Sequence, residues 1–284
     1  MKLDKFNFSN NYYTNIDRTK IYVDHTNRRV KVIDLKNLSI KNIKRIINFS
    51  SKEHLSKIIC NCNRESLDMF KETGFEIEGM IEGYFRGEDA FCMSYFISRD
   101  RKYCMNFSEK DSIVKKSLNV KNTFINNINK SQYYIRNANE NDIEEMVKLF
   151  STVFSTYPSP VLDKEFLKET MNEKVLYKVA IDNGKIIGIA SADMDKENLN
   201  AEITDCATYL QYRGKGVLSN IICDLEAELK KKRFVCLYSL SRAIIPGINI
   251  ALSKQNYKYT GRLINNCNIC SNFEDMNIWV KKIN

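Results

Sequence analysis

The hexapeptide Gln211-Tyr212-Arg213-Gly214-Lys215-Gly216 has the residue types and spacing of an anion-binding loop. Glycine adopts backbone angles that let successive N–H groups converge on one anion. A helix that begins directly after the loop adds the positive end of its dipole, and Arg213 and Lys215 add mobile cations. The segment therefore predicts a cradle for a pyrophosphate.

Other phosphate-binding loops fit this segment less well. A dinucleotide fingerprint requires a third glycine near position 219, where the chain has Ser219. A P-loop requires Gly-Lys-Ser/Thr, whereas Gly216 is followed by Val217. The alternative without a ligand is a tight turn before a helix.

The elements around the loop are those of a mixed α/β fold. A β-rich run at 201–209 precedes it, and Asn183-Gly184 has the residues of a tight hairpin turn between two further β-rich runs. The helix after the loop has one apolar face, formed by Val217, Leu218, Ile221, Ile222, Leu225 and Leu229. The order expected from residue 133 onward is β-α-β-β-β-α-β-α-β-β, with strands at 133–136, 175–181, 186–192, 201–209, 234–238, from 257 and at 276–280, and helices around 143–150, 217–229 and 244–254.

The first half of the chain repeats the end of this order. Segments 57–60, 65–73, 74–79 and 93–97 match 235–238, 248–255, 256–261 and 276–280 in pattern, and one offset holds across 74–79, since 256 − 74 = 261 − 79 = 182. We therefore expect two related domains, 1–118 and 133–284, joined by a polar linker at 119–132. Chance similarity between common helix–strand patterns is the alternative.

Composition and charge exclude several classes of protein. The 284 residues are 43% hydrophobic and 28% charged, as in globular proteins, and the net charge of +9 is dispersed rather than clustered as in a nucleic-acid-binding surface. No run approaches the ~20 apolar residues of a membrane span, and the N-terminus has no run typical of a signal peptide. The sequence predicts a cytoplasmic protein without a nucleic-acid or membrane partner, and it is compatible with a homodimer.

The nine cysteines lie mostly singly inside apolar runs, which is typical of reduced thiols. A tetrahedral zinc site needs four ligands, and both histidines, His25 and His54, are far in sequence from the pair Cys267 and Cys270. No metal is expected.

At the strand–loop–helix junction the chain resembles the GNAT superfamily of acetyl-CoA-dependent N-acetyltransferases, whose pyrophosphate signature is Q/R-x-x-G-x-G/A. The resemblance covers 133–284 in element order, and Asn249-Ile250-Ala251 followed by Asn256-Tyr257 looks like the family's later N-x-x-A…GF segment, with Asn256 in place of the glycine and Ala251 one position early. It implies acetyl-CoA as cosubstrate, with the pyrophosphate on the N–H groups of 213–217 and the pantetheine arm along the preceding strand. The residues implied to bind CoA are Cys206, Ala207, Thr208, Tyr209, Gln211, Arg213, Gly214, Lys215, Gly216, Val217 and Asn249. The first half, which has no glycine loop, looks like a degenerate copy that does not bind CoA.

Several separate segments resemble the β-lysine N6-acetyltransferases, which acetylate the terminal amine of β-lysine to make a compatible solute. These segments are 201–208, 241–243, 263–266 and 274–279. Tyr209-Leu210-Gln211 departs from that pattern, because a Leu-Pro-Glu-like tripeptide is expected there. The resemblance implies a small amine as acceptor. Another small-amine or protein N-acetyltransferase, a CoA-binding sensor without catalysis and a basic nucleic-acid-associated module are the alternatives.

Acetyl transfer to an amine needs a base, because a lysine-like amine is protonated at neutral pH. Glu202 stands where several family members carry such a base, and Asp205 is the second candidate. A regular strand would place the two on opposite faces, a β-bulge could exchange their directions, and both could instead be solvated acids. A backbone N–H near Ala207 or Thr208 is expected to meet the thioester oxygen. The proton donor stays open between Tyr257, a water and none.

A diamino acid as acceptor needs a cation for its carboxylate and acceptors for its second amine. Arg242 can form a two-pronged pair with a carboxylate, while Glu274, Asp193 and Asn266 can receive the amine. Tyr157 lies on a proline-flanked loop that can cover the pocket. Each of these residues could equally serve the fold alone.

Overall fold

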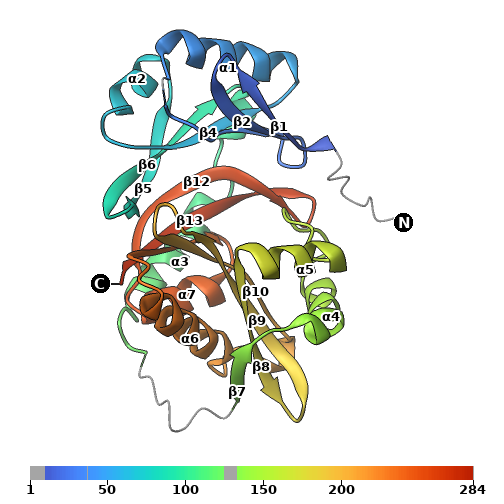
Figure 1. The fold of residues 1–284 in the computed structure, drawn as a ribbon. Helices are drawn as coiled ribbons and strands as arrows, with labels where there is room; N and C mark the ends of the chain where they lie inside the picture. Colours follow the sequence, from blue (N-terminus) through green and yellow to red (C-terminus); the bar gives the residue numbers. More distant parts are fainter. Residues whose placement is uncertain (1–9, 37, 125–132, 284) are drawn as a thin grey trace.

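The structure is a computed structural model that describes residues 10–36, 38–124 and 133–283. Its strands form a 13-stranded sheet in the order β1-β2-β3-β4-β6-β5-β12-β13-β11-β10-β9-β8-β7. Figure 1 shows two lobes, an N-terminal lobe built on β1–β6 and a C-terminal lobe built on β7–β13, which meet where β5 lies beside β12.

The strands are β1 (Tyr12–Ile16), β2 (Thr19–Asp24), β3 (Arg29–Val32), β4 (Lys57–Cys62), β5 (Glu76–Phe85), β6 (Glu88–Phe96), β7 (Tyr134–Asn137), β8 (Val175–Asp182), β9 (Lys185–Asp195), β10 (Asn200–Thr208), β11 (Cys236–Arg242), β12 (Lys258–Ile269) and β13 (Asn272–Lys282). The α-helices are α1 (Ile40–Lys52), α2 (Leu67–Glu72), α3 (Phe107–Leu118), α4 (Ile143–Val153), α5 (Lys164–Glu173), α6 (Val217–Lys231) and α7 (Pro246–Lys254), and the 3₁₀ turns are η2 (Arg99–Lys102), η4 (Glu140–Asp142) and η5 (Leu210–Tyr212).

The C-terminal lobe has the mixed α/β order expected from the sequence, with one helix more. Helix α5 was not predicted, because its few apolar residues are scattered among charged ones; the side chain of Asp163 caps its start by accepting from the N–H groups of Glu165 and Phe166. Strand β11 also begins and ends later than the predicted 234–238. Asn183 and Gly184 both have positive φ, as a tight β8–β9 hairpin requires.

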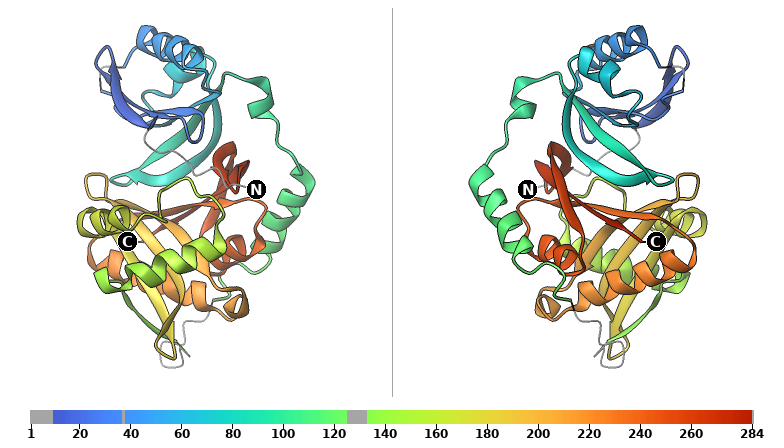
Figure 2. Two further views of the ribbon diagram at one scale, coloured as in Figure 1. Left: turned by 90° about the vertical axis from the view of Figure 1, so that its right-hand side faces the viewer. Right: turned by 90° about the vertical axis from the view of Figure 1, so that its left-hand side faces the viewer.

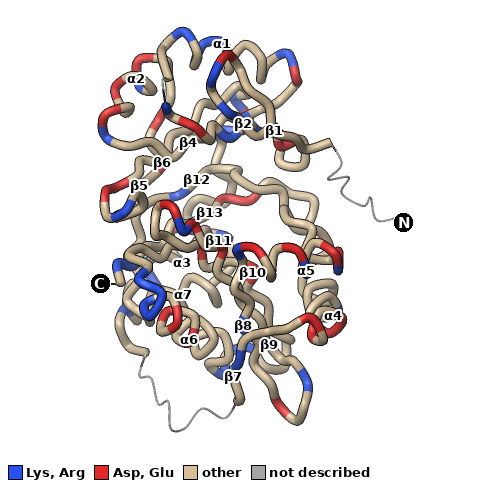
Figure 3. The backbone as a smooth tube through the Cα atoms, viewed as in Figure 1, with Lys and Arg blue, Asp and Glu red and all other residues tan. Residues whose placement is uncertain are grey.

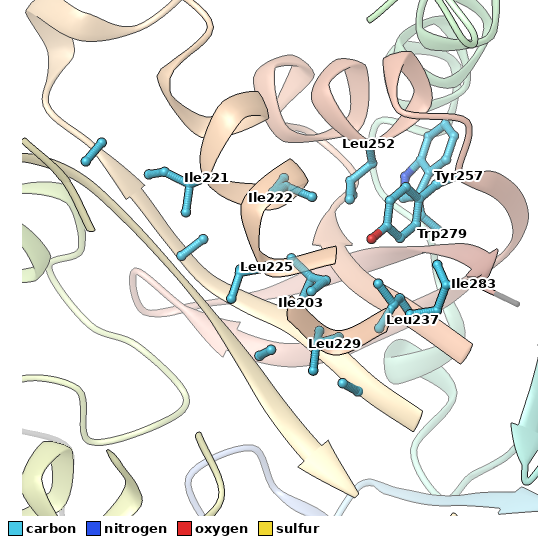
Figure 4. Packing of buried hydrophobic residues seen from close by; sticks show 14 of the residues in the cluster. Ile203, Ile221, Ile222, Leu225, Leu229, Leu237, Leu252, Tyr257, Trp279 and Ile283 are labelled. Atoms are coloured by element: carbon cyan, nitrogen blue, oxygen red, sulfur yellow. The ribbon is translucent and has the colours of Figure 1, made fainter. Parts of the chain in front are cut away.

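Helix α6 anchors the core of the C-terminal lobe. Ile221, Leu225 and Leu229 on its apolar face are fully buried against Ile203 of β10 and Leu237 of β11 (Figure 4). Burying each such side chain stabilises the fold by about 1.5–3 kcal/mol. The helix therefore fixes the loop at its N-terminus relative to β10, the strand that precedes the loop.

The N-terminal lobe mirrors the second half of the C-terminal lobe. The order β3-β4-β6-β5 on one side of the junction corresponds to β10-β11-β13-β12 on the other, and the first pair in each set is parallel. Both lobes have a β-bulge at the same place, before Gly79 and before Gly261. These two glycines, 182 residues apart, pair with each other at the junction. The arrangement supports the expected internal repeat and extends it to β1–β3 and α1.

The lobes are also joined by buried polar contacts. Lys57 of β4 donates from Nζ to Glu78 Oε2 and to the carbonyl of Ile264, both at 2.7 Å, and Glu78 Oε1 accepts from the N–H of Ile264 at 2.6 Å. Arg101 donates from Nε to the carbonyl of Asn265 at 2.7 Å. Residues 264–266 form an irregularity in the β12–β13 ladder, so their backbone groups are available to the other lobe.

The chain passes from the N-terminal lobe to the C-terminal lobe along the side of the molecule, where helix α3 lies against the C-terminal lobe (Figure 2). This helix packs against α7, and Lys110 forms a 2.6 Å ion pair with the fully buried Asp275 of β13. The chain therefore reaches the C-terminal lobe before the predicted linker at 119–132, part of which lies outside the described residues. Figure 3 shows both signs of charge interspersed over the two lobes. Within the described residues, no helix combines the length and apolar character of a membrane span.

Candidate active site

Strands β10 and β11 separate and leave an opening in the sheet. Their parallel ladder pairs Asn200 with Cys236, Ala201 with Leu237 and Glu202 with Tyr238, and it ends there. Among the described residues, 203–208 of β10 have no strand partner on the β11 side. This edge offers backbone groups to an extended ligand, although the carbonyl of Thr208 accepts from Arg213 Nε at 3.2 Å.

The loop after β10 presents bare amides. Gly214 and Gly216 have φ values of 75° and 80°, and a Cβ placed on Gly214 would meet nothing within 4 Å. Helix α6 begins at Val217, and no side chain caps its first turn. The exposed cations Arg213 and Lys215 flank these amides. A diphosphate fits this donor set, because helix-start N–H groups otherwise lack acceptors.

The other residues implied to bind CoA, apart from Asn249, lie at the end of β10 and in the η5 turn that follows it. Ala207 is buried, Cys206, Thr208 and Tyr209 are half-buried, and Gln211 is exposed on η5. The hydroxyl of Thr208 is buried without a hydrogen-bond partner among the described residues. An unsatisfied hydroxyl at this position suits a ligand that lies along β10.

Asn249 has a different environment from the one expected. Its Oδ1 accepts from Ser241 Oγ at 3.0 Å, Asn277 Nδ2 at 2.8 Å and Trp279 Nε1 at 2.8 Å, and its Nδ2 donates to two backbone carbonyls at 2.9 and 2.7 Å. Asn249 is fully buried on α7. Its amide therefore ties α7 to β11 and β13, and no donor or acceptor is left on it for CoA.

A β-bulge in β10 brings the two predicted carboxylates to one side. The β9–β10 register shifts between Thr204 and Ala207, and Asp205 has a φ of 47°. In a regular strand Glu202 and Asp205 would face opposite ways, but the extra residue reverses the alternation. Both side chains consequently line one cleft.

This cleft lies between the two lobes and has a volume of about 850 Å³. The N-terminal lobe contributes Asp24, Arg29 and Lys31, whereas the C-terminal lobe contributes the two carboxylates of β10. A recess of about 410 Å³ adjoins it and shares Glu202 as a lining residue. The volume suits a small molecule.

Glu202 is poised to exchange a proton near neutral pH. Burial raises its pKa from 4.5 to about 7, and the charges of Asp193 and Asp205 act in the same direction. Lys31 and a hydrogen bond with Tyr238 oppose the rise. A base is most effective when its pKa is close to the working pH, so Glu202 has the chemistry of a general base.

The carboxylate of Asp205 is more constrained than that of Glu202. It accepts from Ser191 Oγ at 2.7 Å and is almost fully buried. Burial raises its pKa from 3.8 to about 6, while hydrogen bonds from Ser191 and Tyr157 lower it. Asp205 therefore lies in the same cleft as Glu202 with less freedom to move.

The residues expected to bind the acceptor fall into two groups. Tyr157, Asp193 and Asn266 line the interlobe cleft. Arg242 and Glu274 do not line it; they pair with each other at 2.7 Å across β11 and β13. The ion pair engages Nη2 of Arg242, whereas its Nε is buried with no hydrogen-bond partner among the described residues. The expected role of Arg242 as carboxylate ligand stays a prediction, at a position that does not line this cleft.

The cations of the N-terminal lobe were not among the predicted site residues. Arg29 and Lys31 lie on β3, which was not predicted as a strand, and no local motif marks them. Asn266, which was predicted, is buried and its Oδ1 has no hydrogen-bond partner among the described residues. Aligning the two halves of the internal repeat in the correct register could have pointed to Lys31, because it places this residue opposite the predicted base Glu202 in the alignment.

Comparison with known proteins agrees with this geometry. Residues 134–246 match the family of acetyltransferase (GNAT) domains. The β-lysine N(6)-acetyltransferase of Methanococcus maripaludis is 32% identical over 94% of this chain and 97% of its own length, and that of Methanosarcina mazei is 37% identical over 81% and 93%. The chain belongs to the GNAT acetyltransferases. A third relative, the N-acetyltransferase YodP of Bacillus subtilis, is 33% identical over 92% of this chain and 94% of its own length.

As a member of this family, the protein is an enzyme that transfers an acetyl group from acetyl-CoA to an amine. Family membership also establishes the GNAT fold expected from the glycine loop. Within the described residues, no group of three or more His, Cys, Asp or Glu side chains could hold a metal ion.

Proposed function

We propose that this acetyltransferase acetylates the N6 amine of β-lysine. The observation that carries the proposal is that the similarity to two enzymes of that name extends over both lobes, and the two lobes together line the cleft at Glu202. A generic GNAT domain would match only the C-terminal lobe. The product would serve as a compatible solute, as the sequence resemblance implies.

Bound acetyl-CoA supplies the acetyl group as an activated thioester. In our proposal the N–H groups of 213–217 hold its diphosphate, and the free edge of β10 pairs with its pantetheine arm. The N–H of Ala207 or Thr208 polarises the thioester carbonyl, a contact typically worth ~3 kcal/mol of barrier. Arg213 and Lys215 contribute charge at the loop, and Gln211 lies at its rim.

Glu202 accepts a proton from the N6 ammonium and so makes the amine nucleophilic. Its raised pKa keeps it partly protonated at neutral pH, and it returns the proton to solvent through the open cleft. We assign Asp205 a supporting role, because Ser191 already holds its carboxylate. Asp193, which pairs with Lys174 at 3.0 Å on the cleft wall, and Tyr157 contribute to acceptor binding.

Three further proposals concern the general acid, location and assembly. Tyr257 is fully buried in the core and does not line the cleft, which favours a water as proton donor to the leaving thiolate. The nine cysteines, all within the described residues, form no disulfide, which supports a reducing compartment such as the cytoplasm. The homodimer stays a prediction. Light scattering of the purified protein tests it by measuring the molar mass in solution.

The experiment that tests the function is an acetyl-CoA turnover assay with β-lysine, lysine, spermidine and a histone-like peptide as acceptors. We expect the highest kcat/KM for β-lysine, with acetylation at N6 identified by NMR of the product. A preference for the peptide would assign the enzyme to protein acetylation. No release of free CoA with any of these amines would refute the enzymatic function.

A further inference from the structure

The internal repeat aligns residues of the two lobes one by one. Met93 of β6 and Trp279 of β13 are equivalent, because each lies opposite the residue that precedes the bulge in its lobe. Their partners on the next strand, Cys60 and Ser239, are equivalent in turn. The strand pairing thus corrects the match expected from the sequence by one residue for 57–60 with 235–238 and by three residues for 93–97 with 276–280, because the sequence pattern alone does not fix the register.

The residues that precede Cys60 on β4 and Ser239 on β11 are also equivalent, and their strand partners line the cleft. Ile59 pairs with Lys31 across the parallel β3–β4 ladder, and Tyr238 pairs with Glu202 across the parallel β10–β11 ladder. Lys31 therefore occupies the position in the N-terminal lobe that Glu202 occupies in the C-terminal lobe. Both side chains line the interlobe cleft, so the repeat places a cation and an acid on its two walls.

The N-terminal lobe lines the cleft with three cations, Arg29, Lys31 and Lys36, and two carboxylates, Asp24 and Asp34. Arg29 forms a 3.0 Å ion pair with Asp24 and donates to the carbonyl of Asn266 at 2.7 Å. Asp24 also accepts from Asn27, so its oxygens are occupied. Among the described residues, no ion pair within 4 Å involves Lys31.

The charge on Lys31 is poorly compensated. The neighbouring guanidinium of Arg29 and burial lower the pKa of Lys31, while the carboxylates of Asp24 and Glu202 raise it. An anion that enters the cleft next to Lys31 would remove this repulsion. The buried Oδ1 of Asn266 adds an unpartnered polar atom to the same cleft.

The opposite wall is acidic. Glu202, Asp205 and Asp193 line the cleft from the C-terminal lobe. A cleft with one positive and one negative wall is complementary to a molecule that has a carboxylate at one end and an ammonium group at the other. An acceptor with this charge pattern would be oriented with its amine toward Glu202.

We propose that Lys31, backed by Arg29, binds the carboxylate of the acceptor, so that the N-terminal lobe selects amino acids over amines without a carboxylate. The inference rests on the proposed function, since it names the group that recognises the same substrate. It gives the lobe that lacks a CoA loop a direct part in substrate selection. Lysine is suited to this contact, because its ammonium group presents several rotatable donors to a carboxylate.

The test compares kcat/KM for β-lysine and for its carboxamide, which keeps the shape of the substrate and removes its negative charge. Lys31→Met should lower kcat/KM about ten- to hundredfold for β-lysine, because a charge-assisted hydrogen bond contributes about 1.5–3 kcal/mol. Because Lys31 also lowers the pKa of Glu202, both enzymes are compared at pH 9, where this carboxyl group is deprotonated. The carboxamide should then be a poor substrate for both enzymes, with little difference between them. Lys31→Arg should retain most of the activity with β-lysine.

Lys20→Met is the matched control. Lys20 lies on the neighbouring strand β2, is exposed, and does not line the cleft. Its substitution removes the same charge from the same lobe and should leave both acceptors unaffected. The Kd for CoA and the Tm of Lys31→Met should equal those of the wild type, since Lys31 is far from the glycine loop in the other lobe.

The outcomes separate the inference from the function on which it rests. If the wild type acetylates β-lysine and Lys31→Met lowers kcat/KM equally for acid and amide, carboxylate recognition by Lys31 is overturned while the function stands. If the wild type does not acetylate β-lysine, the proposed function fails and the inference fails with it. A selective loss with the acid, restored by arginine, supports the inference.

Discussion

Replacing Glu202 by glutamine tests both the chemistry and the electrostatics of the cleft. Burial raises the pKa of Glu202 from 4.5 to about 7, so the folded protein binds a proton there that the unfolded chain releases between these two values. The contribution of Glu202 to the free energy of unfolding of the wild type is therefore greatest below pH 4.5 and is lost as the pH rises through 7. Glutamine has the shape of the protonated acid and carries no charge at any pH.

The expected magnitude follows from the size of the shift. About 1.4 kcal/mol per pKa unit, applied to the rise from 4.5 to about 7, gives on the order of 3 kcal/mol as an upper bound. Water in the open cleft reduces this value. Glu202→Gln should therefore gain stability relative to the wild type between pH 5 and pH 9, by roughly 1–3 kcal/mol in urea denaturation.

Activity should change in the opposite direction. Wild-type kcat/KM should rise with pH through about 7 as Glu202 loses its proton. The variant should lose about 10²- to 10⁴-fold in kcat and lack this limb of the profile, since it has no basic group at the position. Glu197→Gln, at an exposed position on the rim of the same cleft, is the control and should behave as the wild type.

Two results would refute this reasoning. An unchanged pH profile in Glu202→Gln would move the base to Asp205 or to solvent. The free energy of unfolding of Glu202→Gln relative to the wild type could also be the same at pH 5 and at pH 9. That result would show that Glu202 is well solvated in the folded protein, and its assignment as a tuned base would lose its physical support.

Three further substitutions probe the glycine loop, the β5–β12 junction and the buried ion pair between Lys110 of α3 and Asp275 of β13. Gly214→Val should weaken CoA binding at least tenfold by calorimetry with little change in Tm, because a β-branched residue resists the positive φ that aims the loop amides. Gly261→Ala should destabilise the protein by several kcal/mol in urea, because its Cβ would lie 2.3 Å from the carbonyl oxygen of Glu78. Asp275→Asn should cost about 3–5 kcal/mol in the same assay, since it leaves the ammonium of Lys110 buried without a counter-charge.

Each of these variants has a matched control. Gly184→Val imposes the same positive-φ strain in the β8–β9 hairpin and should leave CoA affinity intact. Gly247→Ala adds a methyl group with nothing within 4 Å and should change stability by less than about 0.5 kcal/mol. Asp111→Asn removes an exposed ion pair from α3 at a cost of about 0.5 kcal/mol or less. A control that behaves like its partner variant would contradict the mechanism assigned to that pair.

The sequence by itself determined the features that depend on local backbone chemistry. Gly214 and Gly216 have the positive φ values that their residue type permits, and Asn183-Gly184 forms the expected hairpin. Helix α6 buries the face that its 3.6-residue periodicity predicted. These signals are readable because each depends on residues a few positions apart.

Only the tertiary structure decided which side chains meet in the cleft. The bulge at Asp205 placed two carboxylates on one side of β10, and the pairing of β11 with β13 brought Arg242 to Glu274, outside the cleft. Lys31 reaches the site because β5 and β12 join two lobes whose cleft residues are about 170 positions apart in the chain. Register and pairing between distant strands depend on the whole sheet, so no local pattern of residues specifies them.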